Sequence, residues 1–160
     1  MEHLRFLEMA VDLSEKALDA GAGGPFGAVI VRDGVVLGSS GNRVFENTDP
    51  TSHAEIMAIR DACANANRAD LSGATIYSSA EPCPMCMAAI YWARISHVFF
   101  ANTEEDSLRY GFIDKLILQE LRKAPEDRSI KSARIENKHA IEIFEKAREQ
   151  GFGSRPFKNK

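Results

Sequence analysis

The chain has 160 residues and a formal net charge of −3, which fits one globular domain with a sizeable core. Proteins that grip nucleic acid usually carry a basic surplus, so this charge disfavours a long polynucleotide substrate. No apolar run approaches the roughly eighteen residues of a membrane span, and the N-terminus lacks a signal-peptide pattern. Three cysteines do not make a disulfide framework, so we expect reduced thiols and a cytoplasmic protein.

The first predicted element is a helix that ends at the glycine-rich stretch beginning with Gly21. Two β-rich runs follow, Gly27–Val31 and Val35–Gly38. The Asp33-Gly34 pair between them predicts a tight hairpin, because both residue types tolerate the turn's backbone conformation. The periodicity of the first helix predicts a buried face made of Leu4, Leu7, Val11 and Leu18.

Helices and strands alternate through the middle of the chain. A helix is expected from about Ser52, then a strand, a helix that starts at Pro84, and a buried strand. The order α-β-β-α-β-α-β predicts one three-layer α/β domain over residues 1–160, with helices covering a mixed sheet. The helix from Ser52 would bury Ile56, Ile59 and Cys63. The other expected elements are strands Ala74–Ser78, His97–Ala101 and Ser129–Ile135, and helices Pro84–Arg94, Asp114–Leu121 and His139–Gln150.

Two fragments carry the chemistry: His53-Ala-Glu55, and Cys83-Pro-Met-Cys86 after Pro82. A catalytic zinc takes three protein ligands and leaves one position open for water, and His53, Cys83 and Cys86 supply one imidazole and two thiolates. Cys83 and Cys86 lie at a strand-to-helix junction, where the helix dipole favours thiolates. The sequence therefore predicts one zinc ion per chain, with Glu55 beside it as general base and then general acid.

Each fragment alone has a simpler interpretation. Glu55, three residues after Ser52, would complete a capping box, and Cys83 with Cys86 would form a redox pair. A lone His53 would more often be a hydrogen-bonded polar residue than a ligand. Their occurrence together and in this order favours the metal site. We interpret the remaining candidates as structural: Cys63, His3, His97 and His139.

His-x-Glu followed by Pro-Cys-x-x-Cys is the signature of zinc deaminases, and by it the chain is identified as a member of the cytidine deaminase-like superfamily. That resemblance implies a three-layer α/β/α fold around a central mixed five-stranded sheet. Further segments resemble the bacterial guanine deaminases: Gly23–Val31, Asn47–Glu55, Ala89–Arg94, Gly111–Asp114 and Ala124–Arg128. They imply hydrolysis of guanine to xanthine and ammonia by zinc-bound hydroxide, with Glu55 as proton shuttle.

The same resemblance implies a substrate pocket. Phe26 would wall the ring, and the amide of Asn42 would serve as donor and acceptor toward the purine O6 and N7 edge. Asp114 would accept hydrogen bonds from the N1–H and 2-amino donors of guanine. Without the resemblance, Asn42 reads equally as a turn residue and Asp114 as a helix N-cap.

The resemblance also implies a homodimer whose C-terminal segment, from about 139 to 160, is exchanged between chains. Relatives carry a tyrosine near the end of this tail, whereas this chain has none after Tyr110 and offers Phe157 instead. Guanosine, ammeline or a pyrimidine therefore remain alternative small-molecule substrates. A tRNA adenosine deaminase is a further alternative, as is a non-catalytic zinc module, although a structural zinc needs no spare carboxylate such as Glu55.

Overall fold

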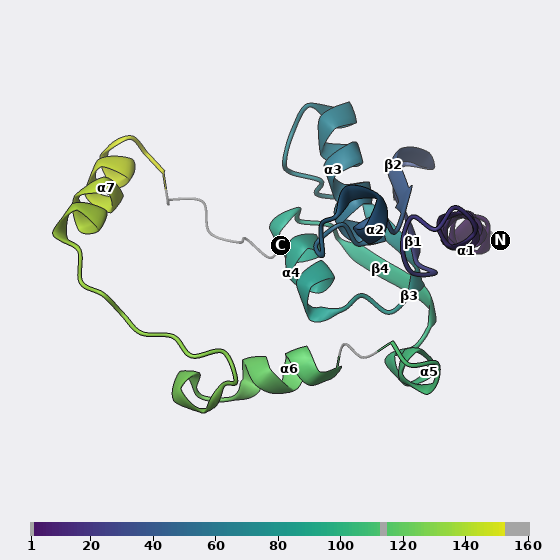
Figure 1. Ribbon diagram of the computed structural model, residues 1–160. Coiled ribbons are helices and arrows are strands. Elements are labelled where there is room, and N and C mark those ends of the chain that lie inside the picture. Colours follow the sequence, from purple (N-terminus) through teal and green to yellow (C-terminus); the bar gives the residue numbers. More distant parts are fainter. Residues whose placement is uncertain (1, 113–114, 153–160) are drawn as a thin grey trace. The chain divides into compact units, whose positions relative to one another are not determined.

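The computed structural model describes residues 2–112 and 115–152, and the chain divides into two compact units, Met1–Gln119 and Glu120–Lys160. The boundary falls inside helix α6 (Lys115–Arg122), and the second unit also holds a short 3₁₀ helix at Pro125–Asp127 and α7 (Lys138–Glu149). The first unit contains α1 (Glu2–Asp19), β1 (Gly27–Arg32), β2 (Val35–Gly41), α2 (Val44–Asn47), α3 (Ala54–Ala66), β3 (Thr75–Ala80), α4 (Pro84–Trp92), β4 (His97–Asn102) and α5 (Glu104–Arg109) (Figure 1).

The sheet of the first unit is mixed, with strand order β2-β1-β3-β4. β1 is antiparallel to both β2 and β3, whereas β3 and β4 run parallel. The β1–β2 hairpin turns at Asp33 and Gly34, whose φ angles of 52° and 75° are both left-handed, as the Asp-Gly pair predicted. Because β3 and β4 run parallel, their ends, which lead into α4 and α5, lie at the same edge of the sheet.

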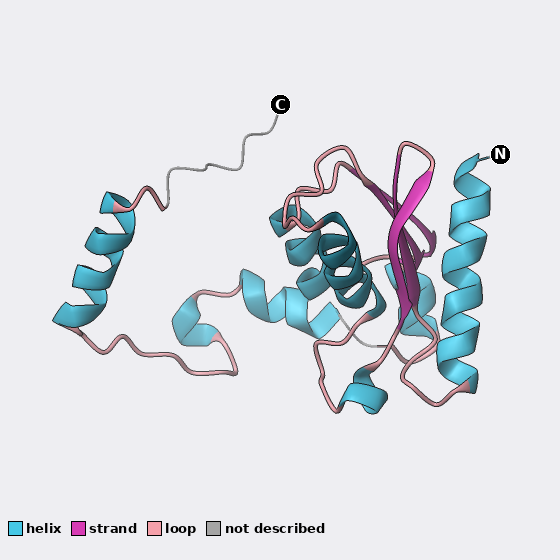
Figure 2. Cartoon of the chain, turned by 90° about the horizontal axis from the view of Figure 1, so that it is seen from above, coloured by secondary structure: helices cyan, strands magenta, loops and turns pink. Residues whose placement is uncertain are grey.

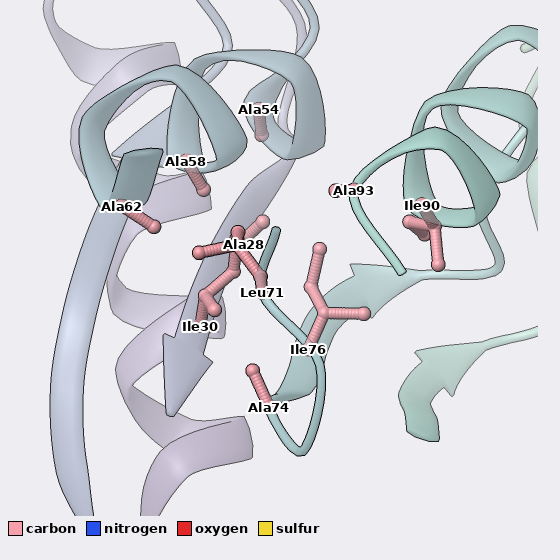
Figure 3. Packing of buried hydrophobic residues seen from close by; sticks show 10 residues of the cluster. All are labelled: Ala28, Ile30, Ala54, Ala58, Ala62, Leu71, Ala74, Ile76, Ile90 and Ala93. Atoms are coloured by element: carbon pink, nitrogen blue, oxygen red, sulfur yellow. The ribbon is translucent and has the colours of Figure 1, made fainter. Parts of the chain in front are cut away.

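Helices cover both faces of this sheet. Figure 2 shows the N-terminal helix α1 lying along one face, with other helices on the opposite side. β1 serves both layers, because Val29 and Val31 pack in the cluster that contains Phe6 of α1, while Ala28 and Ile30 face the other way. Figure 3 shows this second cluster between α3, α4 and the sheet. The expected α/β class is confirmed.

The expected number of strands is slightly wrong, because the sheet of the described residues has four strands and not five. The candidate fifth strand, Ser129–Ile135, has no regular structure. Ile130 and Ile135 are 83% and 91% exposed, so this segment gains neither a ladder of backbone hydrogen bonds nor a buried face. A strand needs at least one of these to hold its extended backbone.

The predicted buried faces of the first two long helices are only partly confirmed. α1 buries Phe6, Ala10 and Ala17. Of its predicted residues, Leu7 is partly buried against this cluster, whereas Leu4, Val11 and Leu18 are exposed. α3 buries Ala54, Ala58 and Ala62, with Ile59 and Cys63 only partly buried at the edge of the cluster. The reason is close packing: a Cβ at Gly27 of β1 would overlap the backbone of Ala10, and one at Gly38 of β2 would overlap that of Ala62. Small residues face the sheet because the backbones nearly touch.

β4 also departs from its prediction as a buried strand. It is the last strand of the sheet and pairs only with β3, so most of its residues are exposed, including Phe99 and Phe100 at 39% each. The short helices α2 and α5 were not predicted. α5 begins with a capping box between Thr103 and Asp106, a signal that the sequence did contain. Among the described residues, no helix is long and apolar enough to cross a membrane.

Candidate active site

Two helix starts meet at one end of the sheet. His53 is the N-cap of α3 and Cys83 is the N-cap of α4, both with extended backbone (ψ 153° and 168°). N-cap side chains usually accept a hydrogen bond from the first turn of their own helix, but neither of these does. Glu55 and Cys86 follow within the first turns. His53 and Glu55 thus lie at the N-terminus of α3, and Cys83 and Cys86 at the N-terminus of α4. At both helix N-termini the helix dipole favours negatively charged side chains.

His53, Cys83 and Cys86 form a cluster whose ligand atoms all lie within 4.8 Å of one another. Nδ1 of His53 is 3.7 Å from Sγ of Cys83 and 3.6 Å from Sγ of Cys86. An imidazole nitrogen and a thiolate on one tetrahedral zinc ion would be about 3.5 Å apart, given typical Zn–N and Zn–S bond lengths. Both separations fit, and the set of one nitrogen and two sulfurs leaves the fourth position open, as catalytic zinc requires.

The thiols are strongly perturbed by each other. The pKa of Cys83 is lowered to about 4, chiefly because the Cys86 side chain hydrogen-bonds to its sulfur, with His53 adding to the effect. The same hydrogen bond, together with burial, raises the pKa of Cys86. The pair thus favours one thiolate on its own, and a divalent cation between the sulfurs would stabilise both in that form. The nearby imidazole of His53, and not these pKa values, distinguishes a metal site from a redox pair.

The capping-box interpretation of Glu55 is wrong. The N-cap position of α3 is held by His53 and not by Ser52, and the Ser52 hydroxyl donates to Oδ2 of Asp49, at 2.9 Å. Glu55 is only 6% exposed, and its Oε1 accepts a hydrogen bond of 3.3 Å from the hydroxyl of Ser78 on β3. Burial raises the pKa of this carboxyl, because the charged form loses solvation. A buried carboxyl with a raised pKa beside a metal site is typical of a proton-transfer group.

A cavity of about 290 Å³ opens onto these residues. Its size lies near the lower limit of small-molecule pockets. Phe26 forms part of the wall, with its ring edge-on to that of Phe112 at a centroid distance of 5.1 Å. The cavity is lined by Phe26, Asn42, His53, Glu55, Glu81, Cys83, Ser107, Gly111 and Phe112.

The structure therefore brings most of the predicted site residues to one place. Phe26, Asn42, His53 and Glu55 line the cavity together with Cys83. Cys86 is fully buried within the metal cluster, and Asp114 lies outside the described residues.

The polar side chain of Asn42 is almost completely buried, at 4% exposure. Its Oδ1 accepts a hydrogen bond from the backbone N–H of Val44 at 3.1 Å, which leaves the amide nitrogen as the group for a ligand. Gly23 lies against this side chain so closely that a Cβ there would overlap Oδ1 of Asn42.

Sequence reasoning missed four cavity residues: Glu81, Ser107, Gly111 and Phe112. Glu81 stands two residues before Cys83, where the motif itself indicated a site, and its carboxylate accepts the backbone N–H of Glu104 at 2.9 Å. Phe112 belongs to a segment that was recognised without a role being assigned to it. Ser107 lies in the unpredicted helix α5 and gave no signal.

Comparison with known proteins agrees with this geometry. The profile of the family described as cytidine and deoxycytidylate deaminase zinc-binding region matches residues 1–102. The chain belongs to this family of zinc-binding deaminases, and its cofactor is zinc. The recognition of the cytidine deaminase-like superfamily is thereby confirmed.

Individual relatives show which deaminases of this family the chain resembles in sequence and structure. Guanine deaminase of Bacillus subtilis (strain 168) is 47% identical over 130 residues, which are 81% of this chain and 83% of the relative. The X-ray structure of guanine deaminase from Bacillus subtilis superposes with a TM-score of 0.89 at 41% identity, covering 98% of both chains. The tRNA-specific adenosine deaminase of Aquifex aeolicus is 40% identical over 100 residues, 62% of this chain and 66% of the relative.

Proposed function

We propose that the protein is a guanine deaminase, which hydrolyses the 2-amino group of guanine to give xanthine and ammonia. The observation that carries the proposal is the shared cavity, which Glu55, Phe26 and Asn42 line together with His53 and Cys83 of the metal cluster. The high coverage and identity of the guanine deaminase relative support this substrate over tRNA adenosine. The negative net charge of −3 supports it as well.

His53, Cys83 and Cys86 would hold the zinc ion. When bound, zinc supplies Lewis acidity that makes water a usable nucleophile near neutral pH. Glu55 is the proton carrier: it accepts a proton from the attacking water and delivers it to ring nitrogen N3. It then accepts the second proton from the hydroxyl group added at C2 and delivers it to the departing amine, as the C2–N bond breaks and the C2 carbonyl forms. The hydroxyl of Ser78 on β3 donates a hydrogen bond to Oε1 of Glu55, and this bond keeps the carboxylate in one orientation during both proton transfers.

Asn42 orients the ring. Because Oδ1 is already engaged by Val44, the side chain presents its N–H donors to the cavity. O6 and N7 of guanine are both acceptors, so an Asn42 donor suits this edge of the purine. This narrows the earlier expectation that the amide acts as both donor and acceptor.

Phe26 and Asp114 complete the proposed pocket. Phe26 offers an aromatic wall for the ring, supported from the side by Phe112. Asp114 would accept from N1–H and the 2-amino group, because a carboxylate offers only acceptors and guanine presents two neighbouring donors. Adenine lacks this donor pair, so its rejection would come from the same residue.

The test is ammonia release by the zinc-loaded protein, with xanthine identified by chromatography. The substrates are guanine, guanosine, adenine, cytosine, cytidine, ammeline and a tRNA anticodon stem. We expect guanine to exceed adenine in kcat/KM by about 10⁴-fold, since a site built for a donor pair rejects a ring that lacks it. Faster turnover of the tRNA stem than of guanine would overturn the proposal.

We further propose a homodimer. α4 and β4 leave large aromatic side chains exposed, with Tyr91 at 65% and Phe99 and Phe100 at 39% each. Such residues are enriched at protein interfaces. Helix α7 leaves Ile141 and Phe144 exposed, which supports exchange of the segment from about residue 139 between two chains. Sedimentation velocity should give twice the mass of one chain; a single-chain mass at micromolar concentration would contradict this.

The compartment we propose is the cytoplasm. Cys63, Cys83 and Cys86 are all free thiols, and metal-ligating thiols persist best where the environment is reducing.

A further inference from the structure

The loop between Asn42 and His53 is tied together by one carboxylate, that of Asp49. Its Oδ1 accepts hydrogen bonds from the backbone N–H and the hydroxyl of Thr51, at 2.8 and 2.7 Å. Its Oδ2 accepts the hydroxyl of Ser52 at 2.9 Å, and Arg60 lies 3.8 Å from the same oxygen. These bonds lower the pKa of Asp49, that from the Thr51 side chain most of all, so the group is ionised at neutral pH.

Ser52 connects this hydrogen-bond network to the two parts of the site, the pocket residue Asn42 and the metal ligand His53. It is completely buried, and its hydroxyl also receives a hydrogen bond from the Asn47 amide at 3.1 Å. Its carbonyl oxygen accepts the backbone N–H of Arg43 at 2.9 Å, next to the pocket residue Asn42. On the other side Ser52 is covalently joined to His53. One buried serine thus joins the strand end that carries the ring-binding amide to the start of the helix that carries the metal ligand.

We propose that Asp49 is a positioning residue, which acts through Ser52 to fix Asn42 relative to His53. The inference rests on the proposed function, since it concerns how the ring edge held by Asn42 is placed against the metal centre. An error of about 1 Å between reacting groups can cost on the order of 10²-fold in rate. Asp49 lies outside the cavity lining, so its carboxylate acts on the site through its hydrogen bond with the Ser52 hydroxyl.

The chain supplies a matched control in Asp70. Its Oδ1 likewise accepts the backbone N–H and hydroxyl of a residue two positions on, Ser72, and its Oδ2 faces Arg94 at 3.3 Å. The Ser72 side-chain hydrogen bond is the main cause of its lowered pKa. Asp70 differs from Asp49 in what its turn leads to: the turn of Asp70 precedes β3 and its Oδ2 faces Arg94, whereas the Oδ2 of Asp49 also accepts the hydroxyl of Ser52, the residue before the metal ligand His53. Removal of either carboxylate should destabilise a similar turn. Only the turn of Asp49 is directly followed by Ser52 and the metal ligand His53.

The experiment compares Asp49→Ala, Asp49→Asn and Asp70→Ala in the zinc-loaded protein. We expect Asp49→Ala to lose about 10- to 100-fold in kcat/KM for guanine with its zinc content unchanged, and Asp70→Ala to lose thermal stability but no activity. Asp49→Asn keeps one acceptor for Thr51 but loses the second acceptor, so it should resemble Asp49→Ala in activity. An Asp49→Asn variant with wild-type activity would overturn the proposal, because the Thr51 turn alone would then suffice.

Two further measurements isolate the mechanism. In the double variant with Asn42→Ala, the loss should be far smaller than the product of the two single losses, because both changes remove the same placement; losses that multiply in full would refute the coupling. Amide hydrogen exchange should accelerate at Arg43 and Val44 in Asp49→Ala and stay unchanged in Asp70→Ala. This readout is independent of turnover: if wild-type protein releases no ammonia from guanine, the proposed function fails, while unchanged exchange at these amides rejects the role of Asp49.

Discussion

Residues 2–112 form a packed core that includes buried polar side chains of the site, whereas no described residue from 120 to 152 is buried. In the first unit Ser52 is 0%, Asn42 4% and Glu55 6% exposed, and each is held by hydrogen bonds. In the second unit the structure depends on local contacts, such as the cap of α7, where Asn137 accepts the N–H of Ala140. The difference teaches that a small chemical change should have a large effect in the first unit and a small one in the second.

The largest effect is expected for Glu55→Gln. The amide keeps the shape of the side chain and can still accept the Ser78 hydroxyl, but it cannot carry protons. Ammonia release from guanine should fall by at least about 10²-fold, the usual contribution of a general acid–base group. Metal analysis should find one zinc per chain, as in the unaltered protein.

Cys86→Ser is the comparison variant, which separates zinc binding from proton transfer. It removes a thiolate from the cluster with His53 and Cys83, so it should lose zinc as well as activity. A Glu55→Gln protein that retained full turnover would contradict the assigned role of this carboxyl. Zinc loss in both variants alike would instead mean that Glu55 supports the metal site.

Gly23→Ala should have an intermediate effect. The added Cβ would overlap Oδ1 of Asn42 and push that amide away from its contact with Val44. We expect kcat/KM for guanine to fall about tenfold through misplacement of the ring, with little change in the thermal midpoint. Steady-state kinetics and calorimetry on the same samples measure both quantities.

Gly38→Ala is the contrasting variant, because its Cβ would overlap the backbone of α3 at Ala62. It should lower the free energy of unfolding by about 1–3 kcal/mol while the folded fraction stays active. If Gly23→Ala behaved in the same way, with lost stability and normal turnover, Asn42 would have no part in placing the substrate.

The features that could be predicted from the sequence are those encoded by neighbouring residues. Asp33-Gly34 specified its own hairpin, and His53, Cys83 and Cys86 specified a ligand set by residue type and spacing. These signals do not depend on distant contacts, so one sequence suffices to read them. The zinc cofactor and the α/β class were accessible for this reason.

The features that escaped prediction depend on how elements approach one another. Periodicity favoured the large residues Leu4 and Val11 for the buried face of α1, but the helix packs through Ala10 against Gly27. Likewise, nothing in the local sequence around Ser107 indicated that α5 would bring it to the cavity. Such choices are made by the geometry of backbone contact, which an apolar pattern does not record.

The smallest effect is expected at Glu120 in the second unit. Its pKa is lowered to about 2, chiefly by the hydrogen bond from Lys123 and also by that from the backbone of Ser129. Because the folded pKa lies below the ordinary value of 4.5, its stabilising contribution is fully present above pH 4.5 and is lost as the pH falls through about 2.

The Glu120 side chain is 32% exposed and its interactions are screened by solvent, so this contribution should be too small to move the global unfolding midpoint at neutral pH. An NMR titration of the Glu120 carboxyl should show the low midpoint, and Lys123→Met should raise it. The protection factor of the Ser129 amide, which corrects for the intrinsic pH dependence of exchange, should fall on acidification, while the amides of β1 stay protected. If Lys123→Met instead lowered the thermal midpoint of the whole protein, the second unit would be coupled to the core, and the contrast between the two units would not hold.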